Sequence, residues 1–203
     1  MTEKEKMLSG RLYIASDEQL MQEHEEAIQK TYRYNRSWLE SSPRERMEQL
    51  IDIFGHIGKE TAVMPDFKCD YGKNIFAGDY FFANYDCIIL DVCPVNIGDY
   101  VFLAPRVCIF TATHPVDSGV RSTGLEYGRP VTIGNHVWIG GQTVINPGVT
   151  IGGHSVIGSG SVVTRDIPSG VIAAGNPCRV IRPLNDADRD FWKKEQMKWR
   201  AKE

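Results

Sequence analysis

His114 and Glu126 are the two residues of this 203-residue chain whose types and setting best suit acid–base chemistry. His114 stands where a polar segment interrupts a regular repeat, and Glu126 lies inside that segment. A neutral imidazole can accept a proton near pH 7, and it is oriented by an acceptor for its other ring nitrogen. We therefore expect His114 to be a general base. Glu126 is either the orienting carboxylate or an ordinary solvated loop residue, and the residues alone favour neither.

Four further residues could bind an anion. Thr164 and Arg165 fall at one corner of the late repeats, and Arg179 and Arg182 lie close together in a segment flanked by prolines. Guanidinium groups bind phosphates through paired hydrogen bonds, so this set could hold a phosphorylated ligand. Scattered arginines are more commonly surface charges, and that alternative stays open.

Two other histidines raise the question of a metal site. His136 and His154 occupy equivalent positions of the repeat and are separated by one full coil, so they should stack on one outer edge. A structural zinc site needs four ligands, and no third ligand at matching height is evident in the sequence. We therefore interpret both as surface corner residues and expect no metal.

A six-residue repeat from Ile133 to Pro168 indicates the element that positions these side chains. Every first position is Ile or Val, four of the six second positions are Gly, and the fifth positions are small or β-branched. This period fits neither an α-helix nor a simple strand, and it is typical of a parallel β-helix. Three successive hexads would close one triangular coil, with first and fifth positions inward and glycines at corners that need positive φ.

The repeat extends over residues 61–183 and is broken once. It begins faintly near Val63, and Cys69 and Cys87, separated by three hexads, should lie one coil apart on the same edge as core filler. Residues 115–131 leave the repeat as a polar loop. A regular solenoid gains nothing structurally from such an excursion, and long loops of this kind are usually functional or disordered.

Helical patterns flank the repeat. In residues 1–60, Ser16 resembles the cap of a helix reaching about Tyr34, and Ser42 is a stronger cap, with Pro at the first helical position and Glu at the third. This region is expected to cap the open end of the solenoid, or else to contact substrate as well. Residues 184–203 read as a C-terminal helix that forms a cap or a subunit contact.

The composition argues against several classes of function. A net charge of −3 argues against general nucleic-acid binding. The chain has no apolar run long enough to cross a bilayer, which argues against a membrane span, and its first residues lead into no signal-peptide-like apolar stretch. The five cysteines show no C-x-x-C pairing, so reduced thiols in a cytoplasmic protein are expected.

Several motifs together resemble the maltose and galactoside O-acetyltransferases of the hexapeptide-repeat superfamily, over nearly the whole chain. Those motifs are Lys6-Met-Leu-Ser-Gly10-Arg-Leu-Tyr13, Phe82-Ala-Asn84, Thr111-Ala-Thr-His114-Pro115, Gly134-Asn-His-Val-Trp138, Ile145-Asn-Pro-Gly148 and Ala174-Gly-Asn-Pro-Cys178-Arg179. Single hexads are common to many acyltransferases, but the Thr-Ala-Thr-His-Pro piece and the N-terminal segment are more specific. Cys69-Asp70-Tyr71-Gly72 is similar to the maltose branch.

The resemblance implies a mainly β protein built as a left-handed parallel β-helix, assembled as a homotrimer with active sites between subunits. It implies acetyl-CoA as donor and a sugar hydroxyl of the maltose or glucose type as acceptor, in a direct ternary mechanism. A galactoside, another glycan, an antibiotic or an amino acid is the alternative acceptor. A non-catalytic scaffold is a further alternative, which would bind no coenzyme A.

The resemblance also implies residue roles. His114 matches the general base, Glu126 the carboxylate that orients it, and Asn84 a residue of the catalytic centre. The acceptor contacts would be Asp70, Asp91 and Asp17. The coenzyme A contacts would be Gly141, Ser159, Thr164, Arg165, Arg179 and Arg182.

Overall fold

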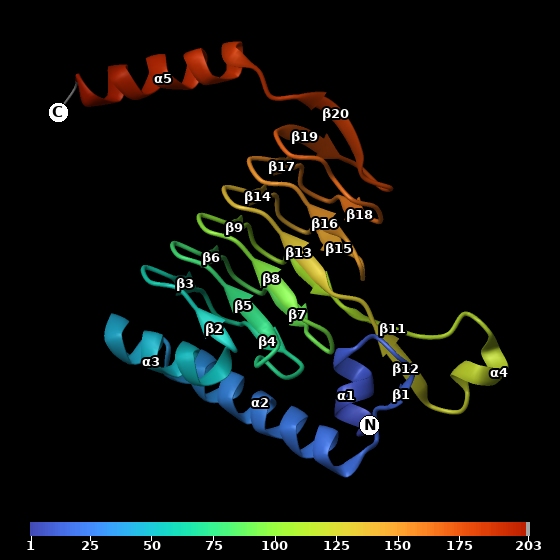
Figure 1. Cartoon of the computed structure of the whole chain (residues 1–203). Coiled ribbons are helices and arrows are strands. Elements are labelled where there is room, and N and C mark those ends of the chain that lie inside the picture. Colours follow the sequence, from blue (N-terminus) through green and yellow to red (C-terminus); the bar gives the residue numbers. More distant parts are fainter. Residues whose placement is uncertain (202–203) are drawn as a thin grey trace.

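The computed structural model describes residues 1–201 and shows a stack of β-coils with helices at both ends (Figure 1). The helices of this part of the chain are α1 (Glu3–Leu8), α2 (Glu18–Ser37), α3 (Pro43–Ile53), α4 (Ser118–Arg121) and α5 (Asp186–Arg200). The strands are β1 (Tyr13–Ile14), β2 (His56–Ile57), β3 (Ala62–Val63), β4 (Lys68–Cys69), β5 (Ile75–Ala77), β6 (Phe82–Ala83), β7 (Ile88–Leu90), β8 (Val95–Ile97), β9 (Phe102–Leu103), β10 (Cys108–Phe110), β11 (Ala112–Thr113), β12 (Leu125–Gly128), β13 (Val131–Ile133), β14 (Trp138–Ile139), β15 (Val144–Ile145), β16 (Thr150–Ile151), β17 (Val156–Ile157), β18 (Val162–Val163), β19 (Val171–Ala174) and β20 (Arg179–Pro183).

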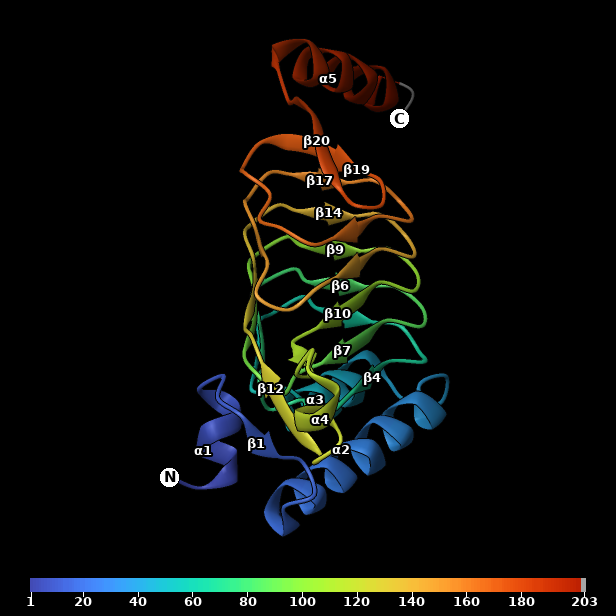
Figure 2. The same ribbon diagram turned by 90° about the vertical axis from the view of Figure 1, so that its right-hand side faces the viewer.

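Three sheets form the sides of the coil, and successive coils stack like rungs (Figure 2). Their strand orders are β16-β13-β8-β5-β2, β20-β19-β17-β14-β9-β6-β3 and β18-β15-β10-β7-β4, which we call faces A, B and C. Neighbouring strands are parallel except at the end of face B, where β20 runs antiparallel to β19. The predicted parallel β-helix is therefore confirmed, while its left-handed sense stays a prediction from the resemblance.

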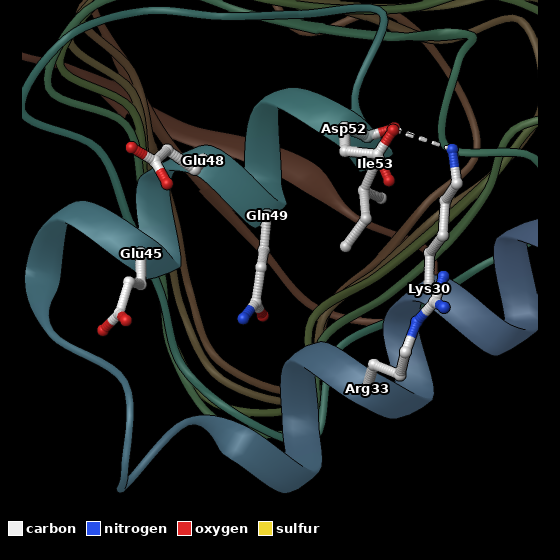
Figure 3. Close-up of a pocket in the computed structure, with 7 residues that line it drawn as sticks. All are labelled: Lys30, Arg33, Glu45, Glu48, Gln49, Asp52 and Ile53. Carbon is white, nitrogen blue, oxygen red and sulfur yellow. Dashed lines mark hydrogen bonds and ion pairs between the residues drawn. The ribbon is translucent and has the colours of Figure 1, made fainter.

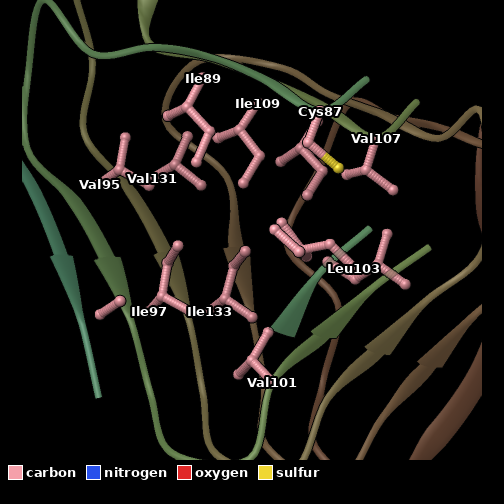
Figure 4. Close-up of a cluster of buried hydrophobic side chains, with 14 of the residues drawn as sticks. Cys87, Ile89, Val95, Ile97, Val101, Leu103, Val107, Ile109, Val131 and Ile133 are labelled. Atoms are coloured by element: carbon pink, nitrogen blue, oxygen red, sulfur yellow. The ribbon is translucent and has the colours of Figure 1, made fainter. Parts of the chain in front are cut away.

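The first and fifth repeat positions fill the core, as predicted. Ile133, Ile139 and Ile145 are at most 1% exposed, and so are the fifth-position residues Thr143 and Ser155. Figure 4 shows the aliphatic side chains of successive coils packed above one another inside the triangle. Small or β-branched side chains suit the fifth position because close-packed interiors leave little room for a longer one.

Coils before the ejected loop are longer than the repeat predicts. Cys69 pairs with Ile89 rather than with Cys87, whereas in the later coils Val144 pairs with Val162, as a regular repeat of three hexads requires. The predicted stacking of Cys69 and Cys87 one coil apart is therefore wrong. Both thiols are buried all the same, so the prediction that they fill the core is confirmed.

The glycines at the second positions of the repeat allow successive coils to pack closely, and their φ angles are not positive. A Cβ on Gly134 would lie 2.6 Å from the backbone nitrogen of Gly153 in the next coil. Left-handed backbone falls instead on corner residues such as Tyr100, with φ of 54°, and His136, with φ of 57°. The expectation of positive φ is therefore wrong for the second-position glycines, which the stacking of coils requires, but Gly148 and Gly160 at fourth positions do have positive φ, of 82° and 71°.

Helices α2 and α3 close one end of the stack. The side chain of Asp17, not the predicted Ser16, caps α2 by accepting a hydrogen bond from the Leu20 N–H at 3.3 Å. Ser42 caps α3 as predicted, in a reciprocal capping box with Glu45. Their buried faces, with Tyr34 among them, join the same hydrophobic cluster as the coils.

Helix α5 extends beyond the last coil and buries none of its side chains (Figure 1). Phe191, Trp192 and Trp199 are all more than half exposed. Across residues 1–201, the helices are all too short or too polar to cross a membrane.

Candidate active site

The ejected segment folds back as a hairpin that lies against the N-terminus. Strand β12 pairs antiparallel with β11 on one side and with β1 on the other, so β12 is the middle strand of a small sheet. The short helix α4 sits at the tip of the excursion, away from the coils (Figure 1). The interruption of the repeat therefore forms an ordered element that joins distant parts of the chain.

This sheet brings the two predicted acid–base residues together. Thr113 pairs with Tyr127, and continuing that register by one residue sets His114 across from Glu126. Residues directly opposite on antiparallel strands have Cβ atoms about 5 Å apart. Within residues 1–201 the Glu126 carboxylate is hydrogen-bonded to Tyr13, whose Oη donates to Oε2 at 2.9 Å, and not to His114. The imidazole of His114 is exposed to solvent.

Asp91 is fully buried and holds a neighbouring turn. Its Oδ1 accepts the backbone N–H groups of Asp70 at 3.1 Å and Tyr71 at 2.9 Å, and its Oδ2 accepts that of Asn74 at 3.2 Å. Burial raises the pKa of this carboxyl, while backbone hydrogen bonds act to lower it. The expected acceptor contact at Asp91 does not fit this position, because the carboxylate is already engaged in holding the 70–74 turn.

Asp70 is the carboxylate that this turn presents. Its Oδ1 lies 3.6 Å from Nε2 of His24, and its side chain is 22% exposed. Burial, and then the negative charges of Asp91 and Glu126, raise the pKa of Asp70 to about 7. A carboxyl in this state can either donate or accept a hydrogen bond near neutral pH, which suits recognition of a hydroxyl.

A groove of about 530 Å³ opens beside Asp70, between α2 and face C. It is lined by Ile28, Thr31, Tyr32, Asn35, Arg36, Asp66, Lys68, Cys69, Asp70, Ile88 and Leu90. Mostly apolar walls with a few polar groups are typical of small-molecule sites. Asp17 is half-buried at the start of α2, just after the strand that pairs with β12, and its side chain is used as the helix cap.

The other predicted residues lie on a different edge of face C. Asn84, Gly141 and Ser159 follow strands β6, β14 and β17 of face B, so they stack on the corner where strands of face C begin. The groove there, of about 620 Å³, is lined by Asp86, Pro105, Arg106, Gly141, Gln142, Ser159 and Gly160. In the part of the chain that the structure describes, the N–H of Gly141 has no hydrogen-bond acceptor.

The four residues predicted to bind an anion lie in different places, and one of them is already paired with a carboxylate. Thr164 and Arg165 are exposed at the corner where β18 ends, and Arg179 is exposed on β20. Arg182, in contrast, makes two hydrogen bonds to the carboxylate of Asp188, at 2.6 and 2.7 Å. Its charge is thus already partnered by the first turn of α5.

One chain therefore carries two half-sites. Strands of face C run parallel, so the residues before them and the residues after them lie on opposite edges. Asp70, His114, Glu126, Thr164 and Arg165 belong to the edge where these strands end. Asn84, Gly141 and Ser159 belong to the edge where they begin.

Comparison with known proteins agrees with this architecture. The family model described as the maltose acetyltransferase hexapeptide capping motif matches residues 6–58, and the bacterial transferase hexapeptide model matches residues 130–165. The galactoside O-acetyltransferase of Escherichia coli K12 is 43% identical over 192 residues, which cover 94% of each chain. This chain belongs to the maltose and galactoside O-acetyltransferase family.

Two solved structures support the assignment of this chain to the family. A maltose O-acetyltransferase from Clostridium difficile 630 is 54% identical, with a TM-score of 0.89, and the match covers 92% of this chain and 99% of that one. A galactoside acetyltransferase in complex with coenzyme A is 42% identical, with a TM-score of 0.87, and the match covers 93% and 94% of the two chains.

Two features of this acetyltransferase were not predicted from its sequence. Tyr13 ends an N-terminal motif, and its contact with Glu126 depends on the pairing of residues 113 apart along the chain. An outward-facing aromatic row, formed by Phe82, Phe102 and Trp138 in register on face B, runs beside the corner that carries Gly141. Aromatic residues at outward strand positions, one coil apart, are the signal that could have indicated this row.

Other polar features of the acetyltransferase lie apart from both half-sites. His136 and His154 stack as predicted, with ring centroids 4.8 Å apart, and no group of three possible metal ligands occurs in residues 1–201. A pocket of about 410 Å³ between α2 and α3 is lined by Lys30, Arg33, Glu45, Glu48, Gln49, Asp52 and Ile53 (Figure 3). It holds an ion pair between Lys30 and Asp52 at 2.9 Å, and none of the residues expected to act on a substrate.

Proposed function

We propose that this acetyltransferase moves an acetyl group from acetyl-CoA to a hydroxyl of a sugar of the maltose or glucose type. The observation that carries the proposal is the antiparallel pairing of β11 with β12, from which we infer that Glu126 lies across from His114. The groove beside Asp70 suits a sugar ring, and the names of the relatives point to the same acceptor class.

His114 is the general base in this proposal. Its imidazole accepts the proton of the sugar hydroxyl as the oxygen attacks, and later returns a proton to the departing thiolate. Glu126 accepts the hydrogen of the second ring nitrogen and so sets the tautomer of the base. A positioned base of this kind contributes roughly 10²–10⁴-fold in rate.

The opposite edge would hold the donor. Acetyl-CoA supplies an activated acetyl thioester, and the N–H of Gly141 would donate to the thioester carbonyl in the groove that this residue lines. One such donor toward developing negative charge is worth about 10²–10³-fold. Ser159 on this edge would contact the rest of the coenzyme, together with Thr164 and Arg165 from the His114 edge of the adjoining chain. Arg179 would also contact it, and Arg182 would join when its pair with Asp188 opens.

The cysteines support direct transfer rather than an acetylated enzyme. All five are free thiols, and four of them are buried. Burial raises the pKa of Cys87 and of Cys93 to about 11, so both stay protonated near pH 7. Because the thiolate is the nucleophile, these residues are poor acetyl carriers.

We further propose that the active enzyme is a homotrimer. His114 and Gly141 lie on opposite edges of face C, so one chain brings its base to the corner that carries Gly141 in the next chain. A contact between two different surfaces of the same molecule closes a ring when the rotation allows it. In this arrangement Asp91 is a positioning residue for the acceptor, and Asp70 makes the contact.

Turnover tests the base. We expect wild-type protein to release free thiol from acetyl-CoA when maltose or glucose is present, and His114→Ala to lower this rate by roughly 10²–10⁴-fold while remaining folded. A panel that adds galactosides, other glycans, an antibiotic and an amino acid identifies the acceptor. Near-normal turnover by folded His114→Ala would remove the assignment of the base.

Subunit mixing tests the shared site. His114→Ala and Gly141→Val are each expected to lose nearly all of the activity, the second because its side chain fills the groove. Co-expression should restore up to about a quarter of the activity, since random mixing completes that share of sites across subunits. If the co-expressed pair stays inactive although the subunits mix, the two half-sites do not combine.

A further inference from the structure

Glu126 lies between two possible partners rather than facing His114 alone. It belongs to the middle strand of the order β1-β12-β11, with Tyr13 paired opposite it in β1. On the other side, the register of β11 continued one residue past Thr113 sets His114 across from it. Tyr13 Oη donates to Oε2, and no donor within residues 1–201 contacts Oε1. A carboxylate can accept hydrogen bonds on both oxygens, so Oε1 stays free for the imidazole of His114.

Packing fixes the direction of the Tyr13 hydroxyl. The side chain is 1% exposed and belongs to a small buried cluster with Met7, Leu20 and Val92. Burial raises the pKa of Tyr13 and the neighbouring carboxylate of Glu126 raises it further, so the hydroxyl keeps its proton and remains a donor. A donor held this way restricts the carboxylate more than a solvent molecule would.

The N-terminal segment that carries Tyr13 is itself fastened to the fold. Cys93 Sγ donates to the carbonyl of Met7 at 3.1 Å, and Ile14 N–H donates to Oε2 of Glu3 at 2.6 Å. A Cβ on Gly10 would lie 3.0 Å from the carbonyl oxygen of Gly128, the last residue of β12. The first contact ties the segment to the coils and the second holds β1 to α1, while the close approach of Gly10 to Gly128 sets the segment against the ejected hairpin.

We propose that Tyr13 is a positioning residue, which holds the Glu126 carboxylate so that its second oxygen orients His114. The N-terminal strand thus completes the active site instead of only covering the end of the β-helix. This inference rests on the proposed function, because Tyr13 acts only through the pair of Glu126 and His114.

Removal of one hydroxyl tests the inference. Tyr13→Phe keeps the packed ring, and we expect it to lower kcat by roughly tenfold to a hundredfold, as for the loss of a hydrogen bond to a charged group. The KM for acetyl-CoA should stay unchanged, because Tyr13 and Glu126 are not among the residues proposed to contact the coenzyme. Tyr34→Phe is the matched control: Tyr34 is also 1% exposed and donates to the carbonyl of Val63, away from the site, so its kcat should be that of wild type.

A double-mutant cycle separates positioning from general support. If Tyr13 acts through Glu126, Tyr13→Phe should cause no further loss in a Glu126→Ala background. Normal kcat in Tyr13→Phe, or the same loss in both backgrounds, would overturn the inference. Should Tyr13→Phe fail to fold, 4-aminophenylalanine and 4-methylphenylalanine at position 13 replace it: the first keeps a donor and should keep kcat, and the second should not.

The outcomes also separate this inference from the proposed function. Wild-type protein that acetylates no member of the acceptor panel would remove the proposed function itself. Wild-type activity that depends on His114 but survives Tyr13→Phe would remove only the role of Tyr13.

Discussion

Substitution of Asp70 by Asn should make the protein more stable at neutral and alkaline pH. The side chain of Asp70 is 22% exposed, and its pKa is raised from 3.8 to about 7 by burial and by the charges of Asp91 and Glu126. The folded state therefore holds the proton more tightly than the unfolded state. Between about pH 4 and pH 7 the unfolded chain releases this proton first, so wild-type stability should fall as the pH rises.

The size of this effect follows from the shift. About three pK units correspond to about 4 kcal/mol at full ionisation, which is an upper value because His24 can offset part of the charge. We expect Asp70→Asn to exceed wild type by about 2–4 kcal/mol in the free energy of unfolding at pH 8, and to match it within about 1 kcal/mol near pH 4.

Urea unfolding at a series of pH values, at one fixed protein concentration, measures this difference. Asp190→Asn is the matched control, because Asp190 is an exposed acid on α5 and its substitution should leave the pH dependence unchanged. A gap between wild type and Asp70→Asn that is equal at pH 4 and pH 8, or a less stable variant at pH 8, would refute the reasoning.

Three further predictions concern the coils and α5. Gly134→Ala should lower the stability measured by thermal unfolding by about 1–3 kcal/mol, because the new Cβ would clash with the backbone of the next coil. Gly124→Ala is the control: its Cβ would meet open space, so it should cost only about 1 kcal/mol, for placing alanine at a φ of +81°. Ser155→Ala should cost about 1–3 kcal/mol, since it leaves buried backbone groups near it without their hydrogen-bond partner. Asp188→Asn removes the charge that holds Arg182 and should lower the KM for acetyl-CoA about two- to fivefold in initial-rate assays; an unchanged KM would place Arg182 outside the donor site.

The repeat allowed most of the coil to be predicted and little of what surrounds it. Inward Ile and Val at every sixth position specify a short strand and its inner face locally, so the positions of Ile133 and Ile139 in the core followed from spacing alone. The coil length before the loop did not follow, because the extra residues of those coils lie in corners whose pattern is weak. Cys69 was therefore matched with Cys87, two residues before its true partner Ile89 in the next coil.

The sequence by itself determined the β-helix, the capped helix at Ser42 and the special position of His114, since each depends on neighbours within a few residues. Only the tertiary structure decided that Glu126 stands between His114 and Tyr13, and that Gly141 lies on the other edge of face C. These relations depend on the pairing of strands that are far apart in the chain, and a one-residue change of register would alter them without changing any local pattern.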